Sequence, residues 1–435
     1  MSDATPDYHS SLQFAAITDV GMRRANNQDS HRVVVADDEA TWLDRGHVFM
    51  VADGMGAHAA GELASKLACD GIPHLYNKYR EKSPPEALEQ SILETNAEVH
   101  RRGQANPDFH NMGTTTSVLA LLPQGAICGH IGDSRIYRLR QDRLEQLTFD
   151  HSLIWELQAA GQIPDGAEVS GAIPKNVITR SLGPNANVQV DIEGPFSVEV
   201  DDVFLLCSDG LTGLVEDPEL ASILANMSPH EAAQVLVDLA NLRGGPDNIT
   251  VIIAKAIGPG IATQAGSAKP LQIGGKKVTP KVHPAIWITL GVCVLAAIVM
   301  LILGELIPAL VAAVGGIVAA IVGLVQRSAR GVDGLQLSDQ RRLGKGPYTN
   351  TPSETSEAFV QSLAEIVADL RSAATENDWI VNWEPFDQLC DQATQSADNG
   401  KFSESVQHYA RGISFMMQQL RSQNERKASD SSVEL

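Results

Sequence analysis

The stretch that constrains this fold most is residues 285–325, which are almost wholly apolar: AIWITLGVCVLAAIVMLILGELIPALVAAVGGIVAAIVGLV. As one helix this stretch would be about 60 Å long, roughly twice the hydrocarbon core of a bilayer. Glu305 and Pro308 interrupt it near its middle. The pattern therefore predicts a transmembrane hairpin of two helices, about 285–303 and 306–325. One tilted span with a buried or interfacial segment is the alternative, and a soluble core helix of this length is not expected.

Basic residues flank this run on both sides, and the positive-inside rule places such flanks in the cytoplasm. They are Lys276, Lys277 and Lys281 before it and Arg327, Arg330, Arg341 and Arg342 after it. The pattern thus predicts a protein of the cell (inner) membrane in which the regions before and after the hairpin are cytoplasmic. Small residues also recur every fourth position in the second helix, at Ala312, Gly316 and Ala320. They would let a partner helix approach closely, but small residues are common in membrane helices anyway.

Composition narrows the function of the remaining chain. The formal net charge of −20 argues against nucleic acid as the main partner, because a phosphate backbone calls for a basic surface. The five cysteines lie far apart without CxxC spacing, which is typical of reduced thiols in a cytosolic setting and argues against zinc fingers and disulfide scaffolds. They are Cys69, Cys128, Cys207, Cys293 and Cys390.

Local composition divides the chain further. Residues 1–11 lack the basic and apolar stretches of a signal peptide and are expected to be a flexible lead-in. Glycine, alanine, lysine and proline dominate 257–284, which predicts a flexible linker, and 326–353 is expected to be a second linker. Apolar stripes at helical spacing predict a helical region over 354–424, followed by a disordered tail at 425–435.

One part of this C-terminal region, QATQSADNGKFSESVQHYARGI, resembles a single tetratricopeptide-type helix pair. A lone repeat cannot bury its own apolar face well. A small helical bundle that packs on itself is therefore favoured over a peptide-binding array.

Residues 12–256 alternate short runs rich in β-branched residues with helical stretches. Several predicted strands follow one another directly, which favours an α+β layered fold over a clean parallel βαβ sheet. The predicted strands are GHVFMVAD, TTTSVLALL, AICGHIGD, DVFLLCSD and NITVIIAK, and the predicted helices cover 60–80, 84–103, 152–160 and 228–242.

Five aspartates lie at or near the ends of predicted strands or close to the N-terminus. They are Asp53 in FMVAD, Asp209 in FLLCSD, Asp133 after CGHIG, Asp247 before NITVIIAK, and Asp29 in RRANNQDS. A single aspartate of this kind is a turn former, but five suggest clustered acids that cannot all stay ionised without a cation. Carboxylates suit Mg²⁺ or Mn²⁺, whereas zinc would usually bring histidine or cysteine.

Two such ions a few Å apart fit the hydrolysis of a phosphate ester. A bridging water would be acidified to hydroxide, and the metals would stabilise the attacking and leaving oxygens. The phosphate itself also calls for a cation. Arg24 precedes Asp29 by five residues, and its planar guanidinium matches two phosphate oxygens.

Eight motifs within residues 12–256 resemble, in the same order, those of a bacterial-type member of the metal-dependent protein serine/threonine phosphatases, the PPM or type 2C family. They are RRANNQD, VADGMGAHAAGE, MGTTTSVLAL, HIGDSRIYRLR, LTFDHSL, ITRSLG, LLCSDGL and GGPDNITV. The resemblance implies an α+β fold with a central antiparallel β-sandwich flanked by helices (αββα) and metals at one end. It also implies hydrolysis of phosphoserine and phosphothreonine by a metal-bridging hydroxide.

The resemblance further implies individual roles for residues around two or three Mn²⁺ or Mg²⁺ ions. Asp53 would bridge two ions, and the Gly54 carbonyl would bind one of them. Arg24 would bind the phosphate, and Asn248 would orient Asp247, although an asparagine also suits a turn there. Asp209 and Asp247 would complete the ligand set of the second metal. Asp29 would hold metal-bound water molecules, and Asp133 would bind the third metal.

The loop after Asp53 departs from the family pattern at two positions. Met55 stands where eukaryotic relatives often have a histidine that is proposed as general acid, and Ala57 replaces a glycine. The leaving serine alkoxide would therefore take its proton from a metal-bound water or from His58. His58 is better explained as a loop histidine with local hydrogen bonds. Ala57 loses the freedom of glycine at positive φ but removes no ligand.

These observations predict a membrane-anchored, Mg²⁺/Mn²⁺-dependent phosphatase. Its expected partners are phosphoprotein substrates, the membrane and, by analogy, an opposing serine/threonine kinase. The alternative is a catalytically inactive phosphatase fold that acts as a membrane scaffold or sensor, whose mark would be lost metal ligands, yet every expected acid is present. A channel built from the hairpin would lack a lined pathway.

Residues 148–186 correspond to the mobile flap that varies within the family.

Overall fold

The computed structural model of the chain describes residues 8–56, 59–163, 177–263, 271–278, 284–328, 331–337 and 343–433. Its contacts divide the chain into two compact units. The larger unit comprises Met1–Lys269 together with Ser338–Leu435, and the smaller unit comprises Pro270–Leu337.

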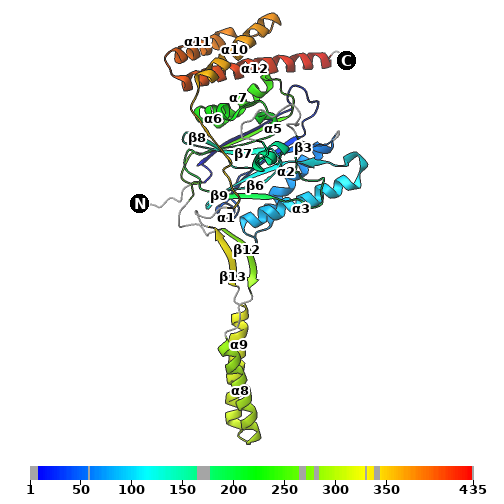
Figure 1. The fold of residues 1–435 in the computed structure, drawn as a ribbon, viewed down its shortest axis with the longest axis vertical. Helices are drawn as coiled ribbons and strands as arrows, with labels where there is room; N and C mark the ends of the chain where they lie inside the picture. The colour runs from blue at the N-terminus through cyan, green and yellow to red at the C-terminus, as the bar shows by residue number, and fades with distance from the viewer. Residues whose placement is uncertain are drawn as a thin grey trace. The chain divides into compact units, whose positions relative to one another are not determined.

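Two antiparallel sheets form the centre of the larger unit (Figure 1). The first sheet has the order β1 (Leu12–Asp19), β11 (Ile249–Ala256), β10 (Val203–Cys207), β7 (Arg135–Arg140), β8 (Arg143–Gln146) and β14 (Thr349–Pro352). The second has the order β2 (Asp29–Val34), β3 (His47–Met55), β5 (Thr116–Leu122), β6 (Gly125–Ile131) and β9 (Asp191–Phe196), with the short β4 (Gly113–Thr114) paired to β3.

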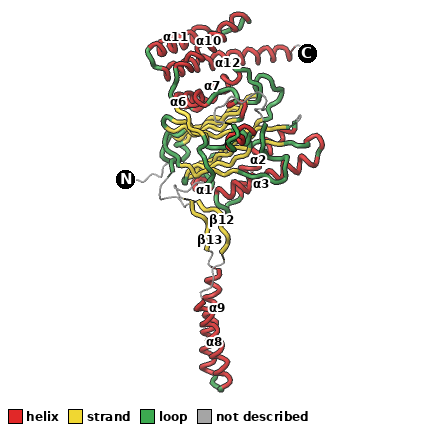
Figure 2. The backbone as a smooth tube through the Cα atoms, viewed as in Figure 1, coloured by secondary structure: helices red, strands yellow, loops and turns green. Residues whose placement is uncertain are grey.

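Helices cover the outer faces of both sheets, as Figure 2 shows. The second sheet carries α2 (Ala60–Lys78) and α3 (Pro84–Ala105), and the first carries α5 (Asp209–Thr212), α6 (Asp217–Asn226) and α7 (Pro229–Leu242). The remaining helices of this part are α1 (Glu39–Asp44), η1 (Pro107–Phe109) and α4 (Leu153–Ala159). The predicted αββα architecture is therefore confirmed.

Strand β3 shows why the sequence of this sandwich reads as continuous apolar runs. Phe49 and Val51 belong to the hydrophobic core between the two sheets. Val48 and Met50, which alternate with them, are also fully buried, and α2 packs against this strand. A strand that is covered on both faces has no polar side, so its sequence shows no alternation.

The C-terminal helices α10 (Glu357–Glu376), α11 (Trp383–Asp398) and α12 (Phe402–Val433) pack on one another, as the predicted bundle requires. They also pack on the helices that cover the first sheet, because α12 contacts α6 and α7. Leu236 of α7, Leu363 of α10 and Ile413 of α12 are fully buried in one shared core. The bundle is therefore a further layer of the larger unit.

Two expectations for this end of the chain were wrong. The tail expected at 425–435 to be disordered is largely helical, since α12 continues to Val433. No glycine or proline occurs between Ile413 and Val433 to end the helix. Part of the linker expected at 326–353 is also structured, because β14 pairs with β8 at the edge of the first sheet.

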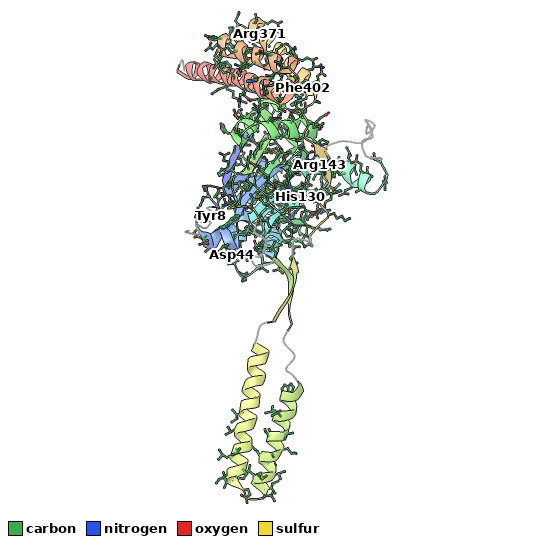
Figure 3. The ribbon with its side chains drawn as sticks, turned by 90° about the vertical axis from the view of Figure 1, so that its left-hand side faces the viewer. Tyr8, Asp44, His130, Arg143, Arg371 and Phe402 are labelled. Carbon is green, nitrogen blue, oxygen red and sulfur yellow. The ribbon has the colours of Figure 1, made fainter. Side chains whose placement is uncertain are left out.

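The smaller unit contains two helices and a two-stranded ribbon. The helices α8 (Pro284–Ile302) and α9 (Leu306–Ser328) pack against each other and are joined at Gly304, whose φ is +79° (Figure 3). The ribbon pairs β12 (Leu271–Val278) with β13 (Gly331–Leu337). It lies within both predicted linkers, so their flexible assignment was wrong here: the alternating patterns LQI and LQL are typical of paired strands.

The two helices predicted for residues 285–303 and 306–325 are thus present within a few residues of their expected ends. Among the helices of the described residues, none is long and apolar enough to span a membrane. The transmembrane assignment made from the sequence is therefore not supported by the structure.

Candidate metal centre

Two of the predicted acids lie opposite each other on neighbouring strands of the second sheet. Asp29 begins β2, Asp53 lies near the end of β3, and the two are direct register partners of this antiparallel pair. Side chains of opposite residues lie on the same face of the sheet, with Cβ atoms about 5 Å apart. Like charges at such positions repel, so this pair requires a proton or a cation to be stable.

The backbone around Asp53 is held by threonines. The Asp53 N–H donates to Oγ1 of Thr115 at 2.9 Å, and its carbonyl accepts a hydrogen bond from Oγ1 of Thr114 at 2.8 Å. Gly54 follows with its N–H donating to the Gln28 carbonyl. A Cβ atom at Gly54 would overlap the carbonyl oxygens of Gln28 and Gly61, so only glycine fits there.

The first sheet and the β6–β7 turn supply two further acids. Asp209 is the first residue of α5, directly after β10, and Asp133 lies between β6 and β7. One carboxylate oxygen of each, Oδ1, is buried without a hydrogen-bond partner among the described residues. A Cβ at Gly210 would overlap the Asn248 carbonyl oxygen, which explains the glycine after Asp209.

Asp247 lies in the loop between α7 and β11 and pairs with Arg24: Nη2 of the arginine is 2.7 Å from Oδ2 of the acid. Asn248 donates its backbone N–H to Oδ1 of Asp247 at 2.8 Å. The Asn248 side chain instead organises the loop before β2, because it bonds the carbonyls of Val20 and Asn26 and the N–H of Gln28. The structure thus brings together the loops that carry Arg24 and Asp247.

Burial and mutual repulsion shift the ionisation of these acids. Burial, together with the charges of Asp209 and Asp247, raises the pKa of Asp29 to about 7, although Ser208 donates to its Oδ2. Burial and the charge of Asp209 raise the pKa of Asp133 to about 7. Burial also raises the pKa values of Asp53 and Asp209. Without a cation, the cluster can be stable only when partly protonated.

This donor set fits a hard divalent cation. Buried carboxylate oxygens of Asp29, Asp133 and Asp209 lack partners among the described residues, and oxygen ligands are what Mg²⁺ and Mn²⁺ prefer. In the side-chain positions described, however, no three acidic, histidine or cysteine residues form a ready metal-binding group. Asp247 is instead paired with Arg24. The individual ligand roles therefore stay predictions.

Two supporting residues were not singled out from the sequence. Ser208 donates from Oγ to Asp29 and accepts the N–H of Thr250, which joins the two sheets beside the acids. Thr115 holds the Asp53 backbone and also bonds Ser134 next to Asp133. Their only sequence signal is their position next to the acidic motifs. The candidate acid His58 and its neighbour at position 57 lie outside the described residues, as does the flap between 164 and 176.

Comparison with known proteins decides the family. The sequence model described as "Protein phosphatase 2C" matches residues 22–242. The chain belongs to this family. A putative protein phosphatase 2C-type of Streptococcus pyogenes serotype M6 is 38% identical over 246 residues, 56% of this chain and 96% of that protein. The serine/threonine phosphatase stp of Listeria monocytogenes serotype 4b is 34% identical over 244 residues, 55% of this chain and 93% of that protein.

A solved structure of the same kind is the Mycobacterium tuberculosis serine/threonine phosphatase PstP/Ppp. It is 34% identical, covers 56% of this chain and 98% of its own, and has a TM-score of 0.49. A second structure, the catalytic domain of PstP in complex with two manganese ions, is 32% identical, covers 57% of this chain and 99% of its own, and has a TM-score of 0.47. Protein phosphatases of the 2C family use Mn²⁺ or Mg²⁺. The family model and the relatives from Streptococcus and Listeria show that the protein is a protein phosphatase.

Proposed function

We propose that this enzyme hydrolyses phosphoserine and phosphothreonine in cytoplasmic proteins with the help of two or three Mn²⁺ or Mg²⁺ ions. The observation that supports the proposal most is the buried acidic cluster: Asp29 and Asp53 are register partners, and Asp133 and Asp209 join them with unpartnered oxygens. Its relatives from Listeria are named serine/threonine phosphatases. All the acids expected of an active member are present, so the inactive scaffold is the weaker alternative.

The residues of the chain have separate tasks in this proposal. Asp29, Asp53, Asp133, Asp209 and Asp247, with the Gly54 carbonyl, would hold the ions. When bound, the ions supply an activated water and stabilise the negative charge that develops on the phosphate. Arg24 is half-exposed beside Asp247 and would bind the phosphate oxygens in a planar, two-pronged contact. Thr115 and Ser208 would fix the acids in place.

The test is phosphate release from a phosphothreonine peptide by the full chain. We expect hydrolysis with Mn²⁺, little with a chelator, and a loss of at least about a hundredfold in kcat for Asp209→Asn, since the acid is part of the reacting site. Activity that survives both chelation and Asp209→Asn would contradict the proposal. A wild-type chain that binds Mn²⁺ but releases no phosphate from any phosphopeptide would favour the scaffold instead.

We further propose that the α8–α9 hairpin attaches the enzyme to the cell (inner) membrane, with the catalytic and C-terminal regions in the cytoplasm. The support is the exposure of large apolar side chains on both helices, for example Leu295 (67%), Ile302 (80%) and Ile307 (79%). Exposed apolar surface of this kind is typical of membrane or protein contact sites. Basic residues also flank the hairpin on both sides in the sequence.

Flotation of the full chain with liposomes tests this attachment. Co-flotation that is lost when residues 284–328 are deleted would support it, and an unchanged distribution would contradict it. A membrane-bound serine/threonine kinase is a reasonable opposing enzyme. Mixing such a kinase, in its phosphorylated form, with the full chain would show whether it is a substrate.

A further inference from the structure

His151, which lies just before α4, joins two parts of the larger unit through its ring. The side chain is fully buried. Its Nδ1 accepts the backbone N–H of Gly132 at 3.0 Å, and its Nε2 lies 2.9 Å from Oδ2 of Asp191. Because a backbone N–H can only donate, Nδ1 carries no proton, and the proton on Nε2 is donated to the carboxylate. The two contacts therefore select one neutral tautomer of the ring.

One side of this ring contacts the loop that carries a predicted metal ligand. Gly132 directly precedes Asp133 and has a φ of +111°, and a Cβ atom there would collide with the Thr115 side chain. The Gly132 carbonyl also accepts the backbone N–H of His151 at 2.7 Å. Both backbone polar groups of Gly132 are thus satisfied by His151. The Oδ1 atom of Asp133 has no partner among the described residues, so this backbone clamp is important for its position.

The other side of the ring contacts Asp191, which together with residues 177–180 is called the flap base below. Asp191 accepts from His151 and from Arg180, whose Nη1 is 2.8 Å from Oδ1. Two backbone hydrogen bonds join the same segments: the Thr179 N–H donates to the His151 carbonyl, and the Leu153 N–H donates to the Val177 carbonyl. Burial raises the pKa of Asp191, but the hydrogen bonds that His151 and Arg180 donate and the charge of Arg180 outweigh it, so the pKa lies below its usual value. The carboxylate is therefore a stable, charged acceptor.

We propose that His151 is a positioning residue that fixes the Asp133 loop through Nδ1 and the flap base through Nε2. The inference rests on the proposed phosphatase function for its effect on the reaction, but not for its effect on the structure. An imidazole is suited to this task because its two nitrogens point in different directions from one rigid ring. An error of about 1 Å in the position of a group that supports the site can cost a hundredfold in rate.

Two substitutions separate the two contacts. In His151→Asn the amide oxygen lies close to the former Nδ1 position and can accept the Gly132 N–H. In His151→Gln the longer amide reaches the former Nε2 position and can donate to Asp191 but leaves the Gly132 N–H without its acceptor. We expect kcat to fall by about tenfold or more for His151→Gln and by only a fewfold for His151→Asn, as is usual for residues that support metal ligands.

Hydrogen exchange of backbone amides provides a readout that does not depend on catalysis. We expect faster exchange in the peptide that contains Gly132 for His151→Gln, and faster exchange in the peptide that contains Thr179 for His151→Asn. This crossed pattern follows only if each nitrogen serves its own partner. Equal exchange in both peptides for the two variants would overturn the proposal.

His47 offers a matched control. It is also fully buried, and its Nδ1 accepts a backbone N–H, that of Ala36, at 3.0 Å. His47→Asn and His47→Gln therefore report the cost of replacing a buried histidine of the same kind away from the acids. A kcat pattern for the His151 pair that matches the His47 pair would mean that His151 is merely structural.

Asp191→Asn provides a second route if the His151 variants fail to fold. It removes the charge that binds Arg180 and leaves the Gly132 contact intact. We expect faster exchange at Thr179, unchanged exchange at Gly132, and a change mainly in KM for a phosphopeptide. Exchange at Thr179 like that of the wild type would overturn the flap half of the proposal. A wild-type chain without phosphatase activity would instead contradict the proposed function, and the exchange data would still test His151.

Discussion

Asp29 and Asp53 are direct register partners on the antiparallel strands β2 and β3. Two buried carboxylates at such positions are unfavourable for folding, because like charges directly opposite each other destabilise a sheet. Here Ser208 donates to one of them, and burial together with the neighbouring acids raises the pKa of both. The acidic cluster therefore lowers the stability of the protein in the absence of a cation, and this loss of stability can be measured.

The first prediction concerns the pH dependence of the metal-free protein. The pKa of Asp29 rises from its ordinary value of 3.8 to about 7 in the folded state, and that of Asp133 also rises to about 7. The folded state therefore holds these protons more tightly than the unfolded chain, so the free energy of unfolding should decrease as pH rises between about 4 and about 7. Thermal unfolding in a chelator at a series of pH values measures this decrease.

Bound Mn²⁺ should remove most of this decrease, because the cation then replaces the protons. Other titrating groups act in both conditions, so the difference between the chelated and the Mn²⁺-loaded curves is the informative quantity. Two curves that run parallel over the whole range would mean that the acids do not interact with the ion.

The second prediction concerns Gly54. A Cβ atom at this position would overlap the carbonyl oxygens of Gln28 and Gly61, both of them backbone atoms that cannot rotate away. We expect Gly54→Ala to displace the turn after Asp53 and to lower kcat by at least about tenfold, with a loss of about 1–3 kcal/mol in stability. Phosphatase assays and denaturant unfolding check both values.

Gly412→Ala is the matched control, since this glycine lies within α12 and its Cβ would meet only ordinary contacts, at 3.9 Å or more. Alanine is the better helix former, so this variant should be at least as stable as the wild type. Wild-type activity in Gly54→Ala would show that the turn tolerates a side chain.

The third prediction concerns the C-terminal bundle. Leu363 of α10 is fully buried in the core that α10 shares with α7 and α12. Leu363→Ala should therefore cost about 2–5 kcal/mol and shift the unfolding of the catalytic part as well as that of the bundle. Ile380→Ala is the control, because Ile380 is 80% exposed and should change stability by less than about 0.5 kcal/mol.

Two probes make this test specific, the loss of phosphatase activity and the loss of helical circular dichroism during unfolding. We expect both transitions to move together in Leu363→Ala. A bundle that melts separately while activity persists to the wild-type midpoint would show that the shared core does not couple the two parts.

The fourth prediction concerns Arg24. The guanidinium pairs with Asp247 at the edge of the acidic cluster and is 46% exposed. We expect Arg24→Ala to reduce kcat/KM for a phosphopeptide by about 10- to 100-fold, the usual cost of a lost hydrogen bond to a charged group. The kcat/KM of Arg24→Lys should lie between those of the wild type and Arg24→Ala, because lysine keeps the charge but not the planar contact. Arg23→Ala is the control, because it removes the neighbouring exposed arginine. Equal effects of the two alanine variants would indicate only a general loss of positive charge.

The sequence located the acids of the candidate site, whose ligand roles stay predictions, but it did not predict how the segments are connected. Asp53, Asp133 and Asp209 could be found because each follows an apolar run that is too regular to be a loop, and because glycine follows Asp53 and Asp209 where a side chain would collide with backbone. That Asp29 and Asp53 are register partners could not be predicted, since pairing depends on contacts between strands. Ser208 and Thr115 were missed because a hydroxyl that supports an acid has no pattern of its own.

The segments around the hairpin show the opposite case. Their composition, rich in glycine, lysine and proline, is typical of linkers, yet β12 pairs with β13 and β14 extends the first sheet. Pairing partners 53 or more residues apart compensate for poor local propensity, and local composition does not reveal them. The apolar pattern did predict two helices, α8 and α9, but hydropathy alone could not establish their relation to a membrane.

The most direct test of the metal centre is a calorimetric titration of the metal-stripped full chain with Mn²⁺ at neutral pH, beside Asp53→Asn. The account predicts at least two bound ions and a release of protons by the wild type, because Asp29 and Asp133 must lose the protons that burial favours. Asp53→Asn should lose most of this binding while folding normally. Wild-type binding in Asp53→Asn, or no binding by the wild type, would contradict the account.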